Sequence, residues 1–164
     1  MPKIALTTLA LACAVLTGCA STGSQPQASS SPPVQTTCKA ITEPEVAALF
    51  ERWNQSLKSL SATEVVKNYA ARSILLPTVS NKARLSAAEK EDYFVHFLEN
   101  KPQGRIDMRF VDIGCNTVLD AGLYTFSFAK TGTKVSGRYS FTYGWDGQRW
   151  LITSHHSSAM PEKD

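Results

Sequence analysis

The residues best suited to chemistry lie near the end of the chain. Residues 155–158 read His-His-Ser-Ser and follow the apolar run 150–152, which is typical of a buried strand. Successive side chains of a strand point to opposite faces, so we expect His155 and Ser157 on one face and His156 on the other. His155 could then act as a general base. The alternative is that one histidine is hydrogen-bonded beneath helices while the other lies at a subunit contact.

The same alternation places Thr153 beside His155, and it places Ser154 and Ile152 beside His156. Because the two histidines point apart, they cannot easily share a metal ion. No other His, Cys or carboxylate spacing in the chain is typical of a zinc site. We therefore expect neither a metal nor a cofactor.

Two arginines are candidates for binding an acidic ligand. Arg138 alternates with apolar residues and shares its predicted strand face with Ser140, so both could project into a cavity, where Arg138 would orient a carboxylate. Arg109 is a second candidate of the same kind. The alternative is an internal ion pair with Asp107, Asp112 or another acid, because a buried charge needs a partner.

Aromatic residues would form the walls of such a cavity. Tyr93, Tyr124 and Phe126 are suited to this, although aromatic residues at these spacings are more often plain core. An enzyme built here would be a small cofactor-independent isomerase, cyclase or hydrolase, with His155 as base and Tyr124 as proton donor. Since no acid falls on the predicted inner face, we expect a ligand-binding or assembly module rather than an enzyme.

The first half of the domain is predicted to be mainly helical. Residues 42–45 and 86–89 both have the capping-box pattern that starts a helix. The first helix is predicted to present one apolar face made by Val46, Leu49, Phe50, Trp53, Leu57 and Leu60. Between the two long helices we expect a short helix from Thr63, a strand over 73–76 and a loop over 78–85.

From Ile106 onward the apolar period changes to two, which predicts strands to the end of the chain. Gly114 suggests a bulge, residues 116–122 a turn, and residues 131–133 and 146–147 hairpin connections. Helices followed by a run of strands indicate an α+β domain, in which helices cover one face of a curved antiparallel sheet.

The N-terminal segment predicts export and anchoring. Lys3 precedes an apolar run over 4–15, and residues 16–19 read Leu-Thr-Gly-Cys, a small-residue cleavage site that ends in cysteine. Residues 1–18 therefore resemble a bacterial lipoprotein signal, after which Cys19 would carry lipid. A transmembrane helix is the alternative, but it needs about 20 apolar residues. The resemblance implies a lipid-anchored envelope protein, at the outer membrane facing the periplasm if the host is Gram-negative.

The composition of the chain predicts a flexible tether followed by one folded domain. Residues 19–36 are rich in Ser, Thr, Gln, Pro and Gly, a composition too polar to fold alone. Residues 37–164 have the length of one ordinary domain. The chain carries 17 Lys and Arg against 14 Asp and Glu, interspersed rather than gathered in a basic stripe. Nucleic acid is therefore not expected as a partner.

Two cysteines remain once Cys13 leaves with the signal and Cys19 is lipidated. Cys38 and Cys115 would then be alone in an oxidising compartment, where we expect them to form a structural disulfide. A catalytic cysteine is the alternative, but neither residue has a local sequence signature for that role.

The order of elements, the terminal segment 155–162 and several internal stretches carry a family resemblance. These stretches are Leu49-Phe50-Glu51-Arg52-Trp53-Asn54, Leu75-Leu76-Pro77-Thr78-Val79-Ser80-Asn81, Asp92-Tyr93-Phe94, Gly114-Cys115-Asn116, Tyr124-Thr125-Phe126 and Arg138-Tyr139-Ser140-Phe141. The domain resembles the cone-shaped fold of nuclear transport factor 2-like and SnoaL-like proteins. More narrowly, it is similar to the association (hub) domain of calcium/calmodulin-dependent protein kinase II.

The resemblance implies a homo-oligomer, at least a dimer through the outer face of the sheet. It also implies a cavity between helices and sheet that admits a small polar or acidic ligand. Where the hub's terminal motif places an arginine in the cavity, this chain has Ser157. Kinase activity is not expected, because the chain has no Gly-rich phosphate loop followed by lysine and no HRD or DFG sequence.

Overall fold

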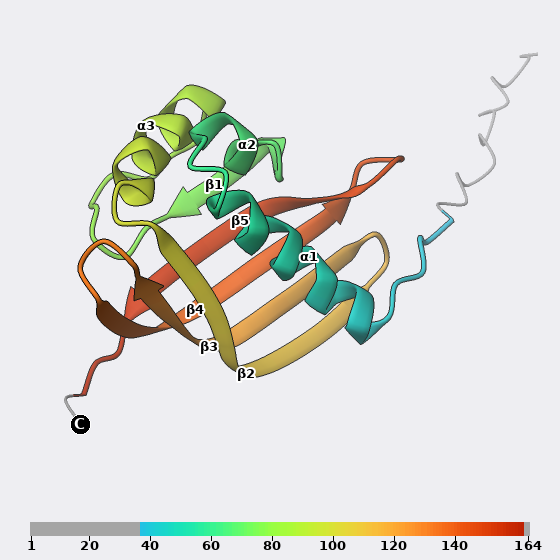
Figure 1. The fold of residues 1–164 in the computed structure, drawn as a ribbon. Helices are drawn as coiled ribbons and strands as arrows, with labels where there is room; N and C mark the ends of the chain where they lie inside the picture. The colour runs from blue at the N-terminus through green and yellow to red at the C-terminus, as the bar shows by residue number, and fades with distance from the viewer. Residues whose placement is uncertain (1–36, 163–164) are drawn as a thin grey trace, which may run out of the picture. The chain divides into compact units, whose positions relative to one another are not determined.

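The computed structural model describes residues 37–162 of the chain. The predictions for the signal, for Cys19 and for the tether up to residue 36 lie outside these residues. The helices of the described part are α1 (Glu43–Leu57), α2 (Ala62–Val66) and α3 (Ala87–Leu98), shown in Figure 1. In this part no helix is both long and apolar enough to cross a bilayer.

The two long helices begin where the capping boxes predict. At α1 the backbone N–H of Thr42 donates to the Glu45 carboxylate over 2.8 Å, and at α3 the N–H of Ser86 donates to Glu89 over 3.1 Å. These contacts satisfy donors that a helix start leaves unpaired. The predicted continuation of the first helix to Leu60 is wrong, because the helix ends at Leu57 and Leu60 is an exposed residue with a positive φ of 54°.

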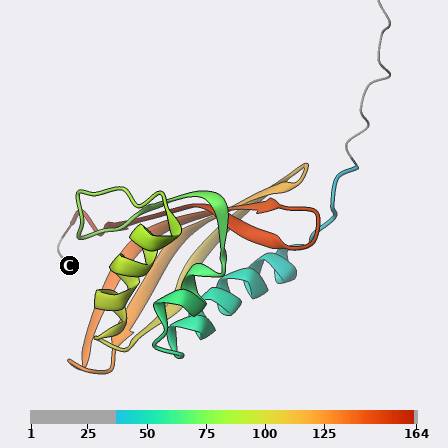
Figure 2. The same ribbon diagram turned by 90° about the horizontal axis from the view of Figure 1, so that it is seen from above.

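The strands form one sheet in the order β1-β5-β4-β3-β2 (Figure 1). Their bounds are β1 (Tyr69–Leu76), β2 (Pro102–Gly114), β3 (Thr117–Phe128), β4 (Thr133–Trp145) and β5 (Trp150–Ala159). Neighbouring strands pair antiparallel, except that β1 runs parallel to β5 at one edge. The helices lie on one side of this curved sheet, as Figure 2 shows, so the predicted α+β architecture is confirmed.

Two strand boundaries differ from the sequence-based prediction. β1 begins at Tyr69, four residues before the predicted strand 73–76, and β3 begins at Thr117, inside the predicted turn 116–122. The bulge of β2 lies at Asp107 rather than at Gly114. Ile106 pairs with Tyr124 and Met108 pairs with Leu123, so Asp107 has no partner residue in β3. Local turn signals in this stretch were overridden by pairing with the adjacent strands.

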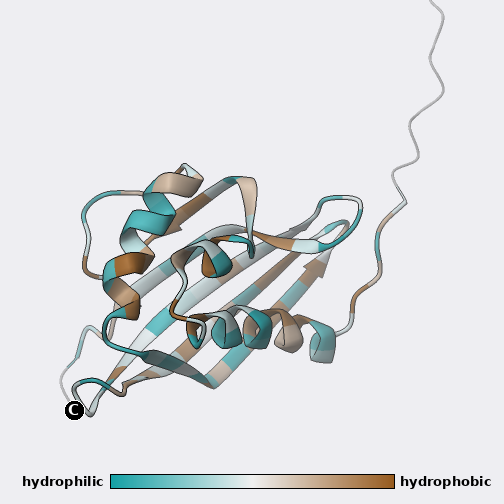
Figure 3. Cartoon of the chain, turned by 45° about the horizontal axis from the view of Figure 1, so that its top comes forward, coloured by the Kyte–Doolittle hydropathy of each residue, from teal (hydrophilic) through white to brown (hydrophobic). Residues whose placement is uncertain are grey.

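The core lies between the helices and the inner face of the sheet. Trp53 of α1 is 1% exposed and packs its ring edge against Phe141 of β4, with centroids 5.3 Å apart. Figure 3 shows hydrophobic and hydrophilic bands alternating along the strands, as expected for a sheet with one covered face. The predicted apolar alternation in β4 is confirmed by Tyr139, Phe141 and Tyr143, which are all buried.

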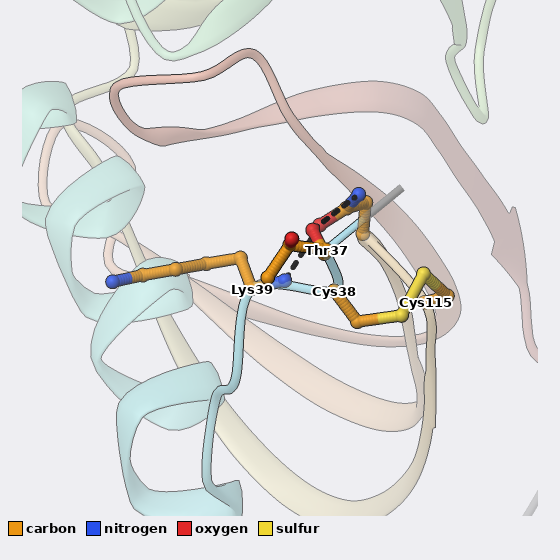
Figure 4. The surroundings of a disulfide bond; sticks show 5 residues. Thr37, Cys38, Lys39 and Cys115 are labelled. Carbon is orange, nitrogen blue, oxygen red and sulfur yellow. Dashed lines mark hydrogen bonds between the residues drawn. A yellow bond between two sulfur atoms is a disulfide. The ribbon is translucent and has the colours of Figure 1, made fainter. Parts of the chain in front are cut away.

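The predicted disulfide between Cys38 and Cys115 is present (Figure 4). It joins the segment before α1 to the turn between β2 and β3, with Cα atoms 4.8 Å apart. Asn116 adds two hydrogen bonds beside it: its side chain accepts from the backbone N–H of Lys39 and donates to the carbonyl oxygen of Thr37. The start of the domain is thereby fixed to the sheet.

Candidate functional site

A cavity of about 260 Å³ lies between α3, the inner face of the sheet and the segment that follows β1. Its lining is mostly apolar and aromatic, with a few hydroxyl groups and one imidazole. The lining residues are Trp53, Leu75, Pro77, Thr78, Val79, Tyr93, Phe94, Phe97, Asn100, Tyr124, Phe126, Phe128, Val135, Ser136, Gly137, His155, Ser157, Ser158 and Ala159. None of these side chains is an Asp, Glu, Lys or Arg, so the cavity presents neutral donors and acceptors.

Three hydroxyl groups converge at Ser157. The Thr78 hydroxyl lies 2.5 Å from Ser157 Oγ, and the Tyr124 hydroxyl contacts the same oxygen. These residues come from the segment after β1, from β3 and from β5, so only the folded chain brings them together. Burial raises the pKa of Tyr124, which therefore keeps its hydroxyl proton at neutral pH. The cluster can both donate to and accept from a small ligand.

His155 lies beside this cluster, buried against aromatic rings. Its Nδ1 is 2.7 Å from the Tyr69 hydroxyl, while its Nε2 is buried and has no hydrogen-bond partner among the described residues. The Phe141 ring stacks on the imidazole with centroids 4.0 Å apart. Burial, followed by the nearby His156, lowers the pKa of His155 to about 3, so the ring is neutral at physiological pH.

The register of β5 corrects one sequence-based assignment. Thr142 pairs with Ser154 and the next residue, Tyr143, pairs with Ile152, so Thr153 is an extra, bulged residue. Ile152 therefore lies on the inner face, where it is fully buried, instead of sharing the face of His156. Simple alternation fails here because a bulge shifts the phase by one residue. His155 and His156 do lie on opposite faces, with His155 buried and His156 exposed.

Arg138 and Ser140 do not line the cavity. Strand β4 turns Tyr139 and Phe141 inward, and this directs Arg138 and Ser140 to the outer face of the sheet. Arg138 is exposed, and its Nε donates to Ser158 Oγ over 3.1 Å. The expected role of Arg138 in the cavity is therefore contradicted by the structure, and so is its alternative as an internal ion pair with Asp107 or Asp112.

Arg109 does point inward, but its partner is an acid that the sequence analysis missed. Its Nε donates to Asp120 Oδ1 over 3.0 Å, and the Tyr139 hydroxyl donates to the same oxygen over 2.8 Å. Asp120 is fully buried, and desolvation raises its pKa against the opposing effects of Tyr139 and Arg109. Asp120 lies two residues after Val118, so in a strand both side chains point to the same, buried face. The sequence analysis missed this because it predicted a turn over residues 116–122. This group lies outside the cavity lining.

The remaining candidates, Tyr93 and Phe126, form cavity walls with Tyr124. Tyr93 stacks on Phe97 one turn further along α3, and burial raises its pKa to about 12. Of the sequence-based candidates, the fold thus brings Tyr93, Tyr124, His155 and Ser157 to the cavity. It adds Thr78 to the lining, and it places Tyr69 outside the lining, in contact with His155; neither had been a candidate.

No group of three or more His, Cys, Asp and Glu side chains within the described residues is arranged to hold a metal ion. The cavity offers hydroxyl groups, one neutral imidazole and an amide instead. This donor set suits a small ligand that both accepts and donates hydrogen bonds.

Comparison with known proteins gives the family. A model of the calcium/calmodulin-dependent protein kinase II association domain matches residues 42–161. No protein with a curated description matches the chain. An association-domain structure from Xanthomonas campestris is 43% identical, covers 78% of this chain and 98% of its own, and has a TM-score of 0.70.

More distant structures share the fold. A nuclear transport factor 2-like protein of unknown function from Pseudomonas putida is 14% identical over 78% of this chain and 93% of its own, with a TM-score of 0.65. The iota-carbonic anhydrase from a cyanobacterium, complexed with bicarbonate, is 21% identical over 77% of this chain and 97% of its own, with a TM-score of 0.68. The fold is therefore nuclear transport factor 2-like, and this chain belongs to the calcium/calmodulin-dependent protein kinase II association domain family.

Proposed function

We propose that the cavity binds bicarbonate or carbon dioxide and interconverts the two. The observation that carries the proposal is the convergence of the Thr78 and Tyr124 hydroxyls at Ser157, in the cavity that His155 also lines. A structural relative that binds bicarbonate has the same fold, which supports the choice of ligand.

The size and charge of the cavity fit this ligand. Its volume of about 260 Å³ lies below the range of pockets for drug-sized molecules, which begins at about 300 Å³. The lining carries no Asp or Glu side chain that would repel an anion. Aromatic walls such as Tyr93 and Phe126 accommodate the apolar carbon dioxide, while the hydroxyl cluster matches the oxygen atoms and the single O–H of bicarbonate.

The reaction balances with one water molecule and a proton acceptor from the solvent. A water oxygen bonds to the carbon of carbon dioxide, one C–O π bond opens onto an oxygen, and one water proton leaves to the solvent buffer. The Ser157 hydroxyl would donate to the oxygen that gains negative charge, held in place by the Thr78 and Tyr124 hydroxyls, which would donate to Ser157 Oγ. Such fixed donors stabilise developing charge because they need no reorganisation during the reaction.

Stopped-flow hydration of carbon dioxide tests the proposal. Ser157→Ala should lower the rate roughly 10²-fold, the usual effect of removing one donor from a charge-stabilising site. Ser154→Ala is the matched control, because Ser154 lies on the same strand and faces outward. The proposal is rejected if the wild-type protein neither hydrates carbon dioxide nor gains thermal stability with added bicarbonate, or if Ser154→Ala loses as much activity as Ser157→Ala.

A second function, homo-oligomerisation, is proposed from the outer face of the sheet. Met108 and Phe110 of the edge strand β2 are 50% and 60% exposed, and they stand opposite Leu123 and Ala121 of β3. Family membership favours an assembling domain. A contiguous apolar surface on a sheet is suited to pairing with a second copy.

Sedimentation analysis of Met108→Asp combined with Phe110→Asp tests this assignment. The wild type should sediment as a dimer or larger assembly and the variant as a monomer. Val95→Asp on α3 is the control, since Val95 is 54% exposed but lies on the helical side. A monomeric wild type, or an assembly unaffected by the two aspartates, contradicts the proposal.

The N-terminal sequence supports a third proposal, that Cys19 anchors the protein to the cell envelope through lipid. Mass spectrometry of the N-terminal peptide should find acyl chains on Cys19, and Cys19→Ser should release the protein from membranes. Cys13→Ser, inside the signal, should leave anchoring unchanged. An unmodified Cys19 overturns the proposal.

A further inference from the structure

His155 lines the cavity, and only one of its two ring nitrogens has a hydrogen-bond partner among the described residues. Nδ1 is occupied by the Tyr69 hydroxyl at 2.7 Å, whereas Nε2 has no partner among the described residues. His155 is 5% exposed, and the centroid of its ring lies 4.0 Å from that of Phe141 and 5.2 Å from that of Trp53. The imidazole therefore cannot rotate without displacing aromatic core.

Tyr69 determines where the ring proton of His155 resides. Burial raises the pKa of Tyr69 well above its ordinary value, so its hydroxyl keeps its hydrogen. Tyr69 is 6% exposed, and among the described residues its hydroxyl has a single hydrogen-bond partner, His155 Nδ1. In either tautomer one buried hydrogen lacks an acceptor among the described residues: the phenolic hydrogen if Nδ1 is protonated, or the Nε2 hydrogen if Nε2 is protonated. His155 lines the cavity and Tyr69 does not, so only the Nε2 hydrogen can be accepted by a molecule bound in the cavity. The phenol therefore donates and Nδ1 accepts.

We propose that His155 meets the ligand as a neutral Nε2–H donor and not as a base, with Tyr69 as the positioning residue that fixes this tautomer. The assignment rests on the proposed function for its ligand, because the donor would hold an oxygen of bicarbonate or of the activated carbon dioxide. It also excludes His155 as the group that removes the water proton. That proton leaves to solvent instead.

Two-bond ¹H–¹⁵N NMR spectra of the ¹⁵N-labelled protein determine which ring nitrogen of His155 is protonated, without any ligand. His96→Gln and His156→Gln assign the spectrum by removing the other two histidines of the chain. His155 should show a protonated Nε2 and an unprotonated Nδ1, unchanged from pH 7 to pH 5. Tyr69→Phe should shift the population toward protonated Nδ1. A wild-type Nδ1–H tautomer, an imidazolium at pH 6, or an unchanged spectrum in Tyr69→Phe would overturn the assignment whether or not bicarbonate binds.

Bicarbonate affinity independently tests whether His155 donates a hydrogen bond to the ligand. The amide nitrogen of a glutamine can replace Nε2–H as a donor, whereas leucine cannot. His155→Gln should therefore bind bicarbonate within roughly tenfold of the wild type, and His155→Leu should lose at least tenfold more, the value of about one hydrogen bond. If glutamine is as damaging as leucine while both variants remain folded, His155 is not a donor. If no variant binds bicarbonate, the proposed function fails, and the tautomer assignment stands on the spectra alone.

Discussion

Gly137 of β4 leaves the space that the ring of Tyr124 occupies. A Cβ at this position would lie 2.9 Å from Tyr124 Cε1 and 2.9 Å from the carbonyl oxygen of Ser158, closer than folded proteins tolerate. The absence of a side chain at Gly137 thus lets Tyr124 reach Ser157. A glycine that breaks the apolar alternation of its strand is explained by the aromatic ring across from it.

Gly137→Ala should therefore displace Tyr124 and weaken its contact with Ser157. We expect a loss of bicarbonate binding of at least tenfold with a smaller effect on folding, measured by titration calorimetry and by thermal unfolding. Gly144→Ala in the same strand is the control, because its new Cβ would meet only the end of the Thr153 side chain, at 3.0 Å. Equal losses in both variants would contradict a specific role for Gly137.

Asn54 connects α1 to the edge strand β2. Its side chain donates to the carbonyl oxygen of Gly104 and accepts from the N–H of Gly104, each over 2.8 Å, and Asn54 is only 2% exposed. Asn54→Ala should lower the free energy of unfolding by about 3 kcal/mol, because both backbone groups lose their partner. Urea denaturation measures this. Gln55→Ala on the exposed side of α1 should change stability little, and a similar loss there would refute the argument.

The disulfide closes a long loop, since Cys38 and Cys115 are 77 residues apart. Replacing Cys115 with serine should cost roughly 4 kcal/mol in the chain-entropy model. The double variant of Cys38 and Cys115 should be as unstable as the single one, and so should the wild type in strong reductant. The denaturant concentration at the midpoint of unfolding, compared among these proteins, measures the loss. A midpoint that reductant leaves unchanged would show that the bond does not stabilise the fold.

The buried His155 predicts a pH dependence of stability. Its pKa is about 3 when folded and about 6.5 in an unfolded chain, so the unfolded state binds more protons between these values. Stability should thus be constant above pH 6.5 and fall as the pH decreases, by about 2 kcal/mol at pH 5. The free energy of unfolding, plotted against pH across this range, should change less steeply in His155→Gln than in the wild type. His156→Gln should keep the wild-type slope, and an identical slope in all three proteins would rule out His155 as the cause.

Much of the fold could be predicted because its signals are local. The capping boxes at Thr42 and Ser86 start helices through contacts three residues apart, and these were read correctly. The pairing of Cys38 with Cys115 followed from cysteine number and compartment alone. The resemblance to the association domain, carried by longer stretches, indicated the layer arrangement and is confirmed by the family match.

The candidate site was predicted only in part, because a site depends on which way each strand faces. The alternation in β4 was correct and its apolar face is the inner one, but Arg138, which lies on the opposite face, was placed in the cavity. The bulges at Asp107 and Thr153 each shift the phase by one residue. Such shifts arise from pairing with a neighbouring strand, which no single segment encodes.

By itself, the sequence determined the helices, the strand-rich second half, the cross-link and the family. Only the tertiary structure decided that Thr78, Tyr124 and Ser157 meet, that Arg109 is neutralised by Asp120, and that His155 is neutral. The physical reason is distance along the chain. Caps and periodicity act over a few residues, whereas burial, register and protonation depend on groups that are distant in sequence and adjacent only after folding.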